Sequence, residues 1–162
     1  VYALFDPQDP VGARSFVLVK KAADRLGVEL IPGPASDSGK ALDRGKTVPD
    51  RADAVFITKS LAFYSPKTMK GIIETSQALK LPLSAESPGT VEMGGLVSCG
   101  EDFYSTGRQA ARLVKQILDG TPPQVLPVES PHLLLAVNLN AARSMGVELT
   151  DDTLKLMDII VR

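Results

Sequence analysis

Short apolar runs alternate with longer segments of helical periodicity along the first half of the chain. The apolar runs predict buried strands at residues 1–5, 28–31, 54–57 and 81–84. The segments between them predict helices at 10–26, near 36–42 and from Ser65 to Leu79. Strands that alternate with amphipathic helices indicate a mostly parallel sheet with helices on both faces, a three-layer α/β fold.

The second half has longer and less regular elements. Its expected elements are a short strand within 94–100, a long helix at 102–119, strands at 125–128 and 133–138, a short helix at 140–145 and a final helix from Asp151 through residue 157. The long helix carries an apolar stripe on one side, formed by Phe103, Ala110, Leu113, Val114 and Ile117. We call this set the α-helical stripe.

Length, net charge and the counts of cysteine and histidine exclude several classes of function. The 162 residues suit one domain, and 18 basic against 19 acidic residues give a net charge of -1, which disfavours nucleic acid as a partner. The single Cys99, which we expect to be buried, cannot form an internal disulfide. The single His132 excludes a multi-histidine metal site and disfavours histidine-based catalysis. We therefore predict no catalytic residue, metal or cofactor.

Polar side chains follow three of the predicted parallel strands. They are Asp6 and Gln8, then Thr58, Lys59 and Ser60, then Glu86 and Ser87. Ligands of such sheets bind at the carboxyl ends of the strands, so we predict a shallow open cleft there. A flavodoxin-like enzyme that uses Asp6 and Lys59 is the alternative from another functional class. Residues 33–40 lack the spacing of a phosphate-binding loop.

Three motifs in the C-terminal half carry a family resemblance. They are VEMGGL at 91–96, GEDFYSTGRQA at 100–110 and the pair PVESP and VNLNAA at 127–131 and 137–142. The chain resembles the ABC-transporter substrate-binding proteins related to the bacterial tryptophan- and tyrosine-binding lipoproteins. That resemblance implies one lobe of a periplasmic-binding-protein type I fold. Residues 1–90 correspond to the lobe core, 91–120 to a hinge strand and a helix of first-lobe type, and 121–162 to a returning segment.

The resemblance also implies a function. Such proteins are non-enzymatic, lie in the periplasm or on a membrane anchor outside the cytoplasm, close two lobes over a small solute and deliver it to an ABC-transporter permease. Because the chain begins at Val1 on a strand, we expect a first lobe to precede it in the native protein. A sensor or interaction domain that has lost its ligand is the alternative within this class.

The expected ligand follows from how the pocket positions compare. Asp102 matches the family, whereas Asp6-Pro7 replaces the usual Asn-Pro and Thr58-Lys59-Ser60 replaces Thr-Asp-Asn. Lys59 reverses the charge of a carboxylate that would receive a ligand ammonium. Among amino acid or carboxylate-like solutes, Lys59 therefore disfavours an unmodified amino acid and favours a carboxylate or another anion.

The α-helical stripe predicts an interaction. Apolar side chains left in water forfeit roughly 1.5–3 kcal/mol each, so the stripe requires a cover. We expect a homodimer through helix 102–119. The alternative is that this helix folds back onto the chain's own sheet.

Overall fold

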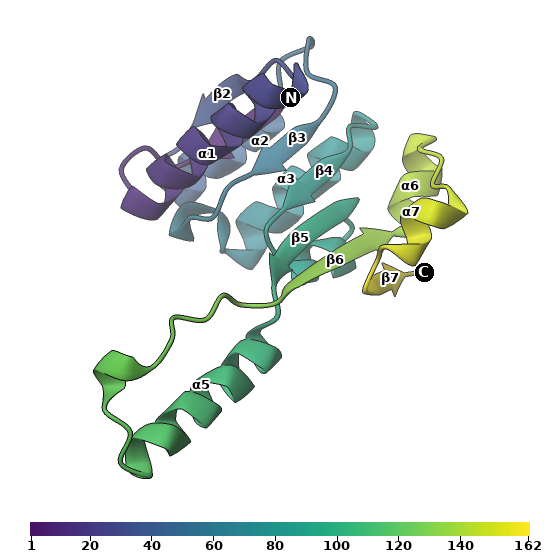
Figure 1. Cartoon of the computed structure of the whole chain (residues 1–162). Helices are drawn as coiled ribbons and strands as arrows, with labels where there is room; N and C mark the ends of the chain where they lie inside the picture. Colours follow the sequence, from purple (N-terminus) through teal and green to yellow (C-terminus); the bar gives the residue numbers. More distant parts are fainter.

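The computed structural model describes residues 1–162 and contains a seven-stranded sheet (Figure 1). The strands lie in the order β2-β1-β3-β4-β5-β6-β7. Their bounds are β1 Tyr2–Phe5, β2 Ile31–Pro34, β3 Val55–Ile57, β4 Leu83–Ala85, β5 Val97–Glu101, β6 Leu133–Asn138 and β7 Ile159–Val161. The first five strands are parallel, β6 is antiparallel to β5, and β7 is parallel to β6. The predicted mostly parallel sheet is confirmed.

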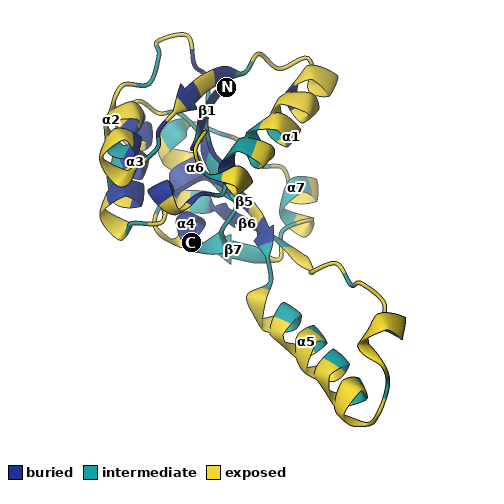
Figure 2. Ribbon diagram, turned by 90° about the vertical axis from the view of Figure 1, so that its left-hand side faces the viewer, coloured by how far each residue is buried: buried dark blue, intermediate teal, exposed yellow.

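Helices cover both faces of this sheet, as expected. One face carries α1 (Pro10–Leu26) and α7 (Asp151–Lys155) (Figure 1, Figure 2). The other face carries α2 (Ser38–Lys46), α3 (Pro66–Ala78) and α4 (Pro88–Glu92). Helix α6 (Leu139–Met145) contacts α3. The remaining long helix, α5 (Phe103–Leu118), projects away from the sheet.

The main core lies between the sheet and the pair α2 and α3. Its largest fully buried side chains include Leu4, Ile57, Ile72, Ile73 and Leu83. Burial of each such side chain stabilises the fold by roughly 1.5–3 kcal/mol. These apolar contacts fix the strand ends whose loops form the candidate site.

The opposite face of the sheet is only partly covered. Helix α1 is held over β1, where the Phe16 ring stacks on Phe5 with 3.9 Å between the ring centroids. No helix crosses β4 and β5 on the face that Figure 1 turns toward the viewer. Side chains of β3, β4 and β5 on this face therefore remain accessible near the strand ends.

Strand β2 lies three residues later than predicted, at Ile31–Pro34 instead of 28–31. Prolines at residues 32 and 34 argued against a strand there, because proline cannot donate a ladder hydrogen bond. However, β2 lies at the edge of the sheet, where proline is tolerated. Strand β4 similarly begins at Leu83 rather than at residue 81.

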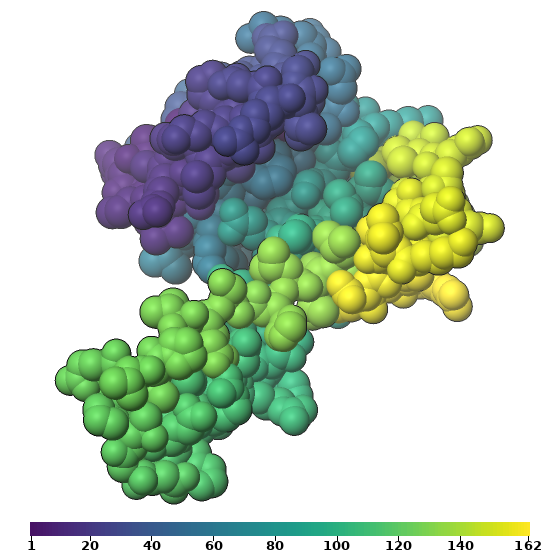
Figure 3. Space-filling model, viewed as in Figure 1, coloured from purple at the N-terminus to yellow at the C-terminus, as the bar shows by residue number.

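Helix α5 and the segment that returns from it form an arm, defined here as residues 102–132. No α5 residue is buried, and the arm stands off the main body (Figure 2, Figure 3). The amide of Gln109 donates to the Ser130 carbonyl at 3.3 Å, and Arg112 forms an ion pair with Glu129. The arm is therefore held together internally, and the alternative that α5 folds back onto the sheet is wrong.

Two other expectations in the second half are corrected. Residues 125–128 form no strand: a single 3-10 turn covers Pro123–Val125, and Val128 is fully exposed. Prolines 122, 123 and 127 deny this segment the ladder hydrogen bonds that a strand needs. The final helix ends at Lys155, and the apolar residues after it form β7 against β6.

Candidate functional site

The loops after β1, β3 and β4 meet at one edge of the sheet because these strands are parallel neighbours. They carry seven of the eight predicted site residues. The structure separates these residues into two groups. Asp6, Thr58 and Ser60 are buried, whereas Lys59, Glu86 and Ser87 are partly exposed.

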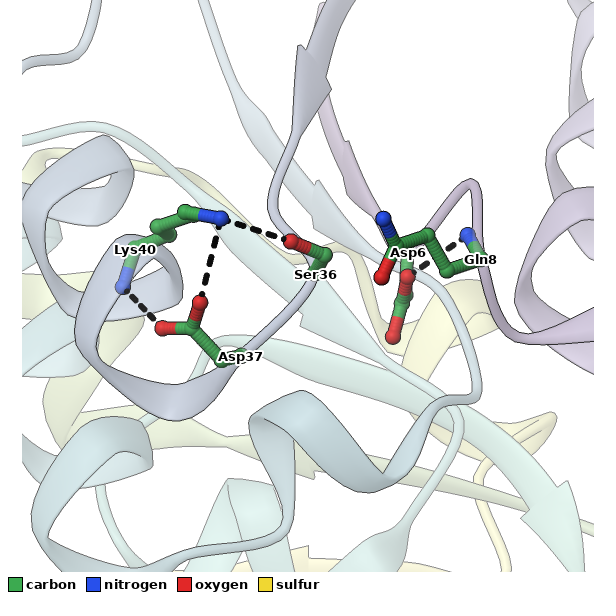
Figure 4. Close-up of polar contacts among 5 residues, drawn as sticks. All are labelled: Asp6, Gln8, Ser36, Asp37 and Lys40. Atoms are coloured by element: carbon green, nitrogen blue, oxygen red, sulfur yellow. Dashed lines mark hydrogen bonds and ion pairs between the residues drawn. The ribbon is translucent and has the colours of Figure 1, made fainter.

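The buried group joins the loops to each other. The Asp6 carboxylate accepts a hydrogen bond from the backbone N–H of Gln8 at 2.8 Å (Figure 4). It also accepts from the backbone N–H of Asp9 at 3.3 Å and from the Ser60 hydroxyl at 3.4 Å. The Thr58 hydroxyl donates to the Leu4 carbonyl at 3.1 Å. Asp6, Thr58 and Ser60 therefore hold β1 and β3 in register and present little free capacity to a ligand.

Gln8 and the loop after β2 do not join the partly exposed residues Lys59, Glu86 and Ser87, which we call the accessible group. Gln8 is exposed. In the β2 loop, Lys40 donates from its ammonium to Ser36 at 3.0 Å and pairs with Asp37 at 3.3 Å (Figure 4). The backbone N–H of Lys40 is the main cause that lowers the pKa of Asp37, the N-cap of α2. The charges in this loop are thus paired locally.

A cleft of about 460 Å³ opens beside the accessible group. This volume falls within the range of small-molecule sites. Loops after β3 and β4, strands β5 and β6, and the first residue of α5 all contribute to its wall. The lining residues are Phe56, Lys59, Tyr64, Glu86, Ser87, Cys99, Gly100, Glu101, Phe103 and Leu133. The cleft therefore brings together Lys59, Glu86 and Ser87 from the predicted set.

The charges in the cleft interact with one another. The Lys59 ammonium lies 3.5 Å from a carboxylate oxygen of Glu101, and the two side chains are 38% and 35% exposed. At that exposure the ion pair contributes only about 0–1 kcal/mol. Lys59 is therefore not an isolated cation, and this pairing argues against the expectation of an anionic ligand, which stays a prediction.

Glu86 is the other carboxylate of the cleft. Burial raises the pKa of Glu86; the backbone N–H and ammonium of Lys59 oppose that rise, and the Glu101 charge adds to it. Burial likewise raises the pKa of the Tyr64 phenol. Glu86 forms no ion pair within 4.0 Å, in contrast to Glu101. The cleft thus holds one carboxylate that forms no direct ion pair.

Asp102 lies outside the cleft and acts as the N-cap of α5. Its carboxylate accepts from the backbone N–H groups of Tyr104 and Ser105 and from the Ser105 hydroxyl. The hydrogen bond from the Ser105 hydroxyl is the largest of the causes that lower the pKa of Asp102. The family match at this position therefore marks the start of a helix.

Sequence reasoning missed the other seven lining residues: Phe56, Tyr64, Cys99, Gly100, Glu101, Phe103 and Leu133. Cys99 was expected to be buried, but it is exposed, because its neighbours Ser98 and Gly100 take the buried face of β5. Strand alternation carried the signal: Cys99 and Glu101 are two residues apart and share one face. Phe56 likewise lies between the buried Val55 and Ile57.

No helix combines the length and apolar character needed to cross a membrane. No three His, Cys, Asp or Glu side chains are arranged to hold a metal ion together.

Solved structures share this architecture. A conserved domain protein from Vibrio cholerae matches with a TM-score of 0.81 and 22% identity, over 98% of this chain and 53% of the other. A domain from Streptococcus pneumoniae in complex with L-Trp matches with a TM-score of 0.82 and 20% identity, over 99% of this chain and 54% of the other. The ligand-free, open structure of a substrate-binding protein with adhesive properties from Clostridium difficile matches with a TM-score of 0.77 and 17% identity, over 99% of this chain and 53% of the other. The chain thus spans about half the length of these structures.

The fold is that of one lobe of a periplasmic-binding-protein type I structure, as predicted. The sequence matches the family described as "ABC transporter substrate binding protein" over residues 1–160. The chain belongs to that family. No curated protein matches the sequence.

Proposed function

We propose that this chain is the solute-binding part of an extracytoplasmic component of an ABC-type uptake system. The observation that carries the proposal is the cleft of about 460 Å³ at the carboxyl edge of the parallel sheet. Charged and aromatic side chains line it together, which suits a small organic solute with a charged group, an amino acid among them. The family membership supports the same role.

Lobe closure is the proposed mechanism. The cleft lies where the arm leaves the sheet, so Phe103 belongs to the arm, whereas Lys59, Glu86 and Glu101, the last residue of β5, belong to the lobe. A solute that contacts both sides shifts the population toward a closed arrangement by as much as its affinity differs between the two states. A second lobe, supplied by the rest of a two-lobed protein, would complete the enclosure.

A binding role also fits better than the flavodoxin-like enzyme. That enzyme would need Asp6 and Lys59 free to meet a substrate. Instead, Asp6 accepts three hydrogen bonds inside the lobe and Lys59 pairs with Glu101. Both residues therefore set the structure and the charge of this edge of the sheet, and the proposed role requires no covalent reaction at either of them.

The partners follow from this role. The proposed partners are a small solute and an ABC-transporter permease, at a periplasmic or membrane-anchored location. For the chain on its own we also propose a second copy as the cover of α5, whose Phe103 and Val114 are 69% and 52% exposed. The contact would be symmetric, as in most homodimers.

A thermal-shift screen with amino acids, amines, carboxylates and nucleotides tests solute binding. A true ligand at 100 times its dissociation constant should raise the melting temperature by roughly 5–10 °C. Cys99→Phe, which fills the cleft, should abolish the shift, and Cys99→Ser should preserve it. Turnover of a screened compound, or an equal shift in Cys99→Phe, would contradict the proposal, as would the absence of any stabilising compound.

A further inference from the structure

The charges that line the cleft do not balance. Two carboxylates, Glu86 and Glu101, face one ammonium, that of Lys59. Lys59 already lies 3.5 Å from Glu101, so the excess negative charge resides at Glu86. Glu86 is half-buried, where an unpaired charge is more costly than on the open surface.

We propose that the cleft recognises its solute through a protonated amine seated at Glu86, with the apolar body of the solute against Phe56, Tyr64 and Phe103. This inference rests on the proposed solute-binding function and names the chemical class of the ligand. A carboxylate on the solute contributes little to recognition. The preferred ligand is therefore an organic cation rather than an anion.

Electrostatics favour the cation for two reasons. An amine at Glu86 supplies the direct ion pair that this carboxylate lacks, and its remaining N–H donors suit the Ser87 hydroxyl, which lines the same cleft. An anion that approached Lys59 would displace or face Glu101 and would meet the charge of Glu86, which Lys59 compensates only in part.

The aromatic side chains favour the same class. Phe56, Tyr64 and Phe103 line the cleft with the two carboxylates. The face of an aromatic ring carries negative charge density and attracts an ammonium within about 6 Å, most strongly where water is excluded. The same rings pack on an apolar body. Carboxylate and aromatic groups thus act together on an amine and oppose each other for an anion.

Three probes with one phenylethyl skeleton isolate the charge. They are phenethylamine, phenylalanine and 3-phenylpropionate, which carry a net positive, zero and negative charge at neutral pH. Isothermal titration of the 162-residue chain at low salt should give an affinity for phenethylamine at least about tenfold above that for 3-phenylpropionate. Phenylalanine should lie between them.

Two variants assign the preference to the cleft. Glu86→Gln should reduce the ratio of amine to anion affinity to less than about threefold, and the control Glu148→Gln, at an exposed residue remote from the cleft, should keep the ratio. Glu101→Gln, which frees Lys59, should shift the ratio toward the anion and provides a second test should Glu86→Gln fail to fold.

Each contrary outcome has a distinct meaning. Equal or tighter binding of 3-phenylpropionate, or a ratio that survives in Glu86→Gln, would overturn recognition of the amine and leave solute binding intact. If none of the three probes binds at millimolar concentration while a compound without an amine stabilises the protein in the screen, recognition of the amine is likewise overturned and solute binding stands. Failure of every compound in both experiments would overturn the proposed function as well.

Discussion

Gly100 in β5 lies directly against the backbone of Glu86 in the loop after β4. A β-carbon built on Gly100 would stand 2.3 Å from the Glu86 carbonyl oxygen and 2.9 Å from its carbonyl carbon. Backbone atoms cannot rotate away as the end of a flexible side chain can. Glycine at residue 100 is thus what permits Glu86 to sit at the wall of the cleft.

Gly100→Ala should therefore displace the Glu86 loop. We expect a loss of about 1–3 kcal/mol in the free energy of unfolding, the usual cost of overpacking, and weaker binding of phenethylamine. Urea unfolding and titration measure the two effects. Gly107→Ala is the matched control, because a β-carbon there meets no atom within 4 Å and alanine favours the helix. Unchanged stability and binding in Gly100→Ala would refute the close contact.

The affinity for phenethylamine should depend on pH. The ammonium pairs with ionised Glu86, whose pKa burial raises above its ordinary value of 4.5 while Lys59 opposes the rise. Glu101 and Tyr64 are the other titratable groups that face this carboxylate. As the pH falls through the raised pKa, Glu86 is protonated, so the affinity should fall, and binding below neutral pH should release protons. Titrations in buffers of different ionisation enthalpy detect that release. An affinity that stays flat from neutral pH to about pH 4 would contradict the role of Glu86.

The same carboxyl should make the unliganded protein less stable at neutral pH. Because the pKa of Glu86 is higher in the folded chain than its ordinary 4.5, folding favours the protonated form. That contribution is fully present below pH 4.5 and is lost as the pH rises through the folded value. Glu86→Gln should thus leave stability at neutral pH unchanged or raise it by less than about 1 kcal/mol, since the group is only half-buried.

Urea unfolding across the acidic range measures this effect. The stability of Glu86→Gln relative to the parent chain should grow from about pH 4 to neutral pH. Glu148→Gln should show no such trend. A marked loss of stability at neutral pH in Glu86→Gln would mean that the carboxylate is a structural partner instead.

Helix α3 ends on a strained residue. Lys80 has φ 54°, a left-handed conformation, and its N–H donates to the Gln77 carbonyl while the Leu81 N–H donates to the Ser76 carbonyl at 2.8 Å. This pattern is a Schellman C-cap, in which glycine is preferred at the left-handed residue. Lys80→Gly should raise the free energy of unfolding by up to about 1 kcal/mol and the melting temperature by roughly 2–4 °C.

A second glycine substitution tests the explanation. Lys70→Gly, at an exposed position in the interior of α3, should lower stability by about 1 kcal/mol, because glycine adds flexibility to the unfolded chain and the exposed ion pair with Glu74 contributes little. Opposite signs for the two substitutions support the strain at Lys80. A loss of stability in both would show that the side chain of Lys80 matters more than its backbone.

The sequence predicted the sheet better than it predicted the site. Apolar strands such as Ala54–Ile57 and amphipathic helices such as α3 carry local periodicity, so the parallel core followed from pattern alone. Strand β2 was misplaced because its prolines are acceptable only at a sheet edge, which is a property of the tertiary arrangement. Strand β7 was missed because its partner β6 is remote in the chain.

The chemistry of the cleft depends on pairing across elements. Lys59 carries a positive charge in the sequence, and only the structure shows that Glu101, 42 residues away, lies beside it. Asp6 and Asp102 were expected to contact a ligand because they are carboxylates, but each accepts hydrogen bonds from backbone N–H groups and from a serine hydroxyl of the chain itself. Tyr64 and Phe103 enter the wall through a turn and a helix start that periodicity does not orient.

The isolated chain should form a homodimer through helix α5. Its stripe is only partly covered: Leu113 is half-buried, whereas Phe103, Val114 and Ile117 are 69%, 52% and 39% exposed. A second copy that packs its own α5 against the part of the helix beyond the cleft, with Leu113, Val114 and Ile117, would remove apolar side chains from water, each worth roughly 1.5–3 kcal/mol when fully buried. Light scattering at micromolar concentration should give a mass of twice 17.2 kDa.

Val114→Glu should return the mass toward that of the monomer, because an unpaired carboxylate in an apolar contact is costly. Val114 is the suitable position because its side chain is exposed in the single chain, so the substitution leaves the fold of one copy intact. Arg108→Glu is the control, since residue 108 lies about a third of a turn away around the helix. A mass of 17.2 kDa for the parent chain, or a dimer that persists in Val114→Glu, would rule out this interface. Dissociation by Arg108→Glu but not by Val114→Glu would instead place the contact on the basic side of α5.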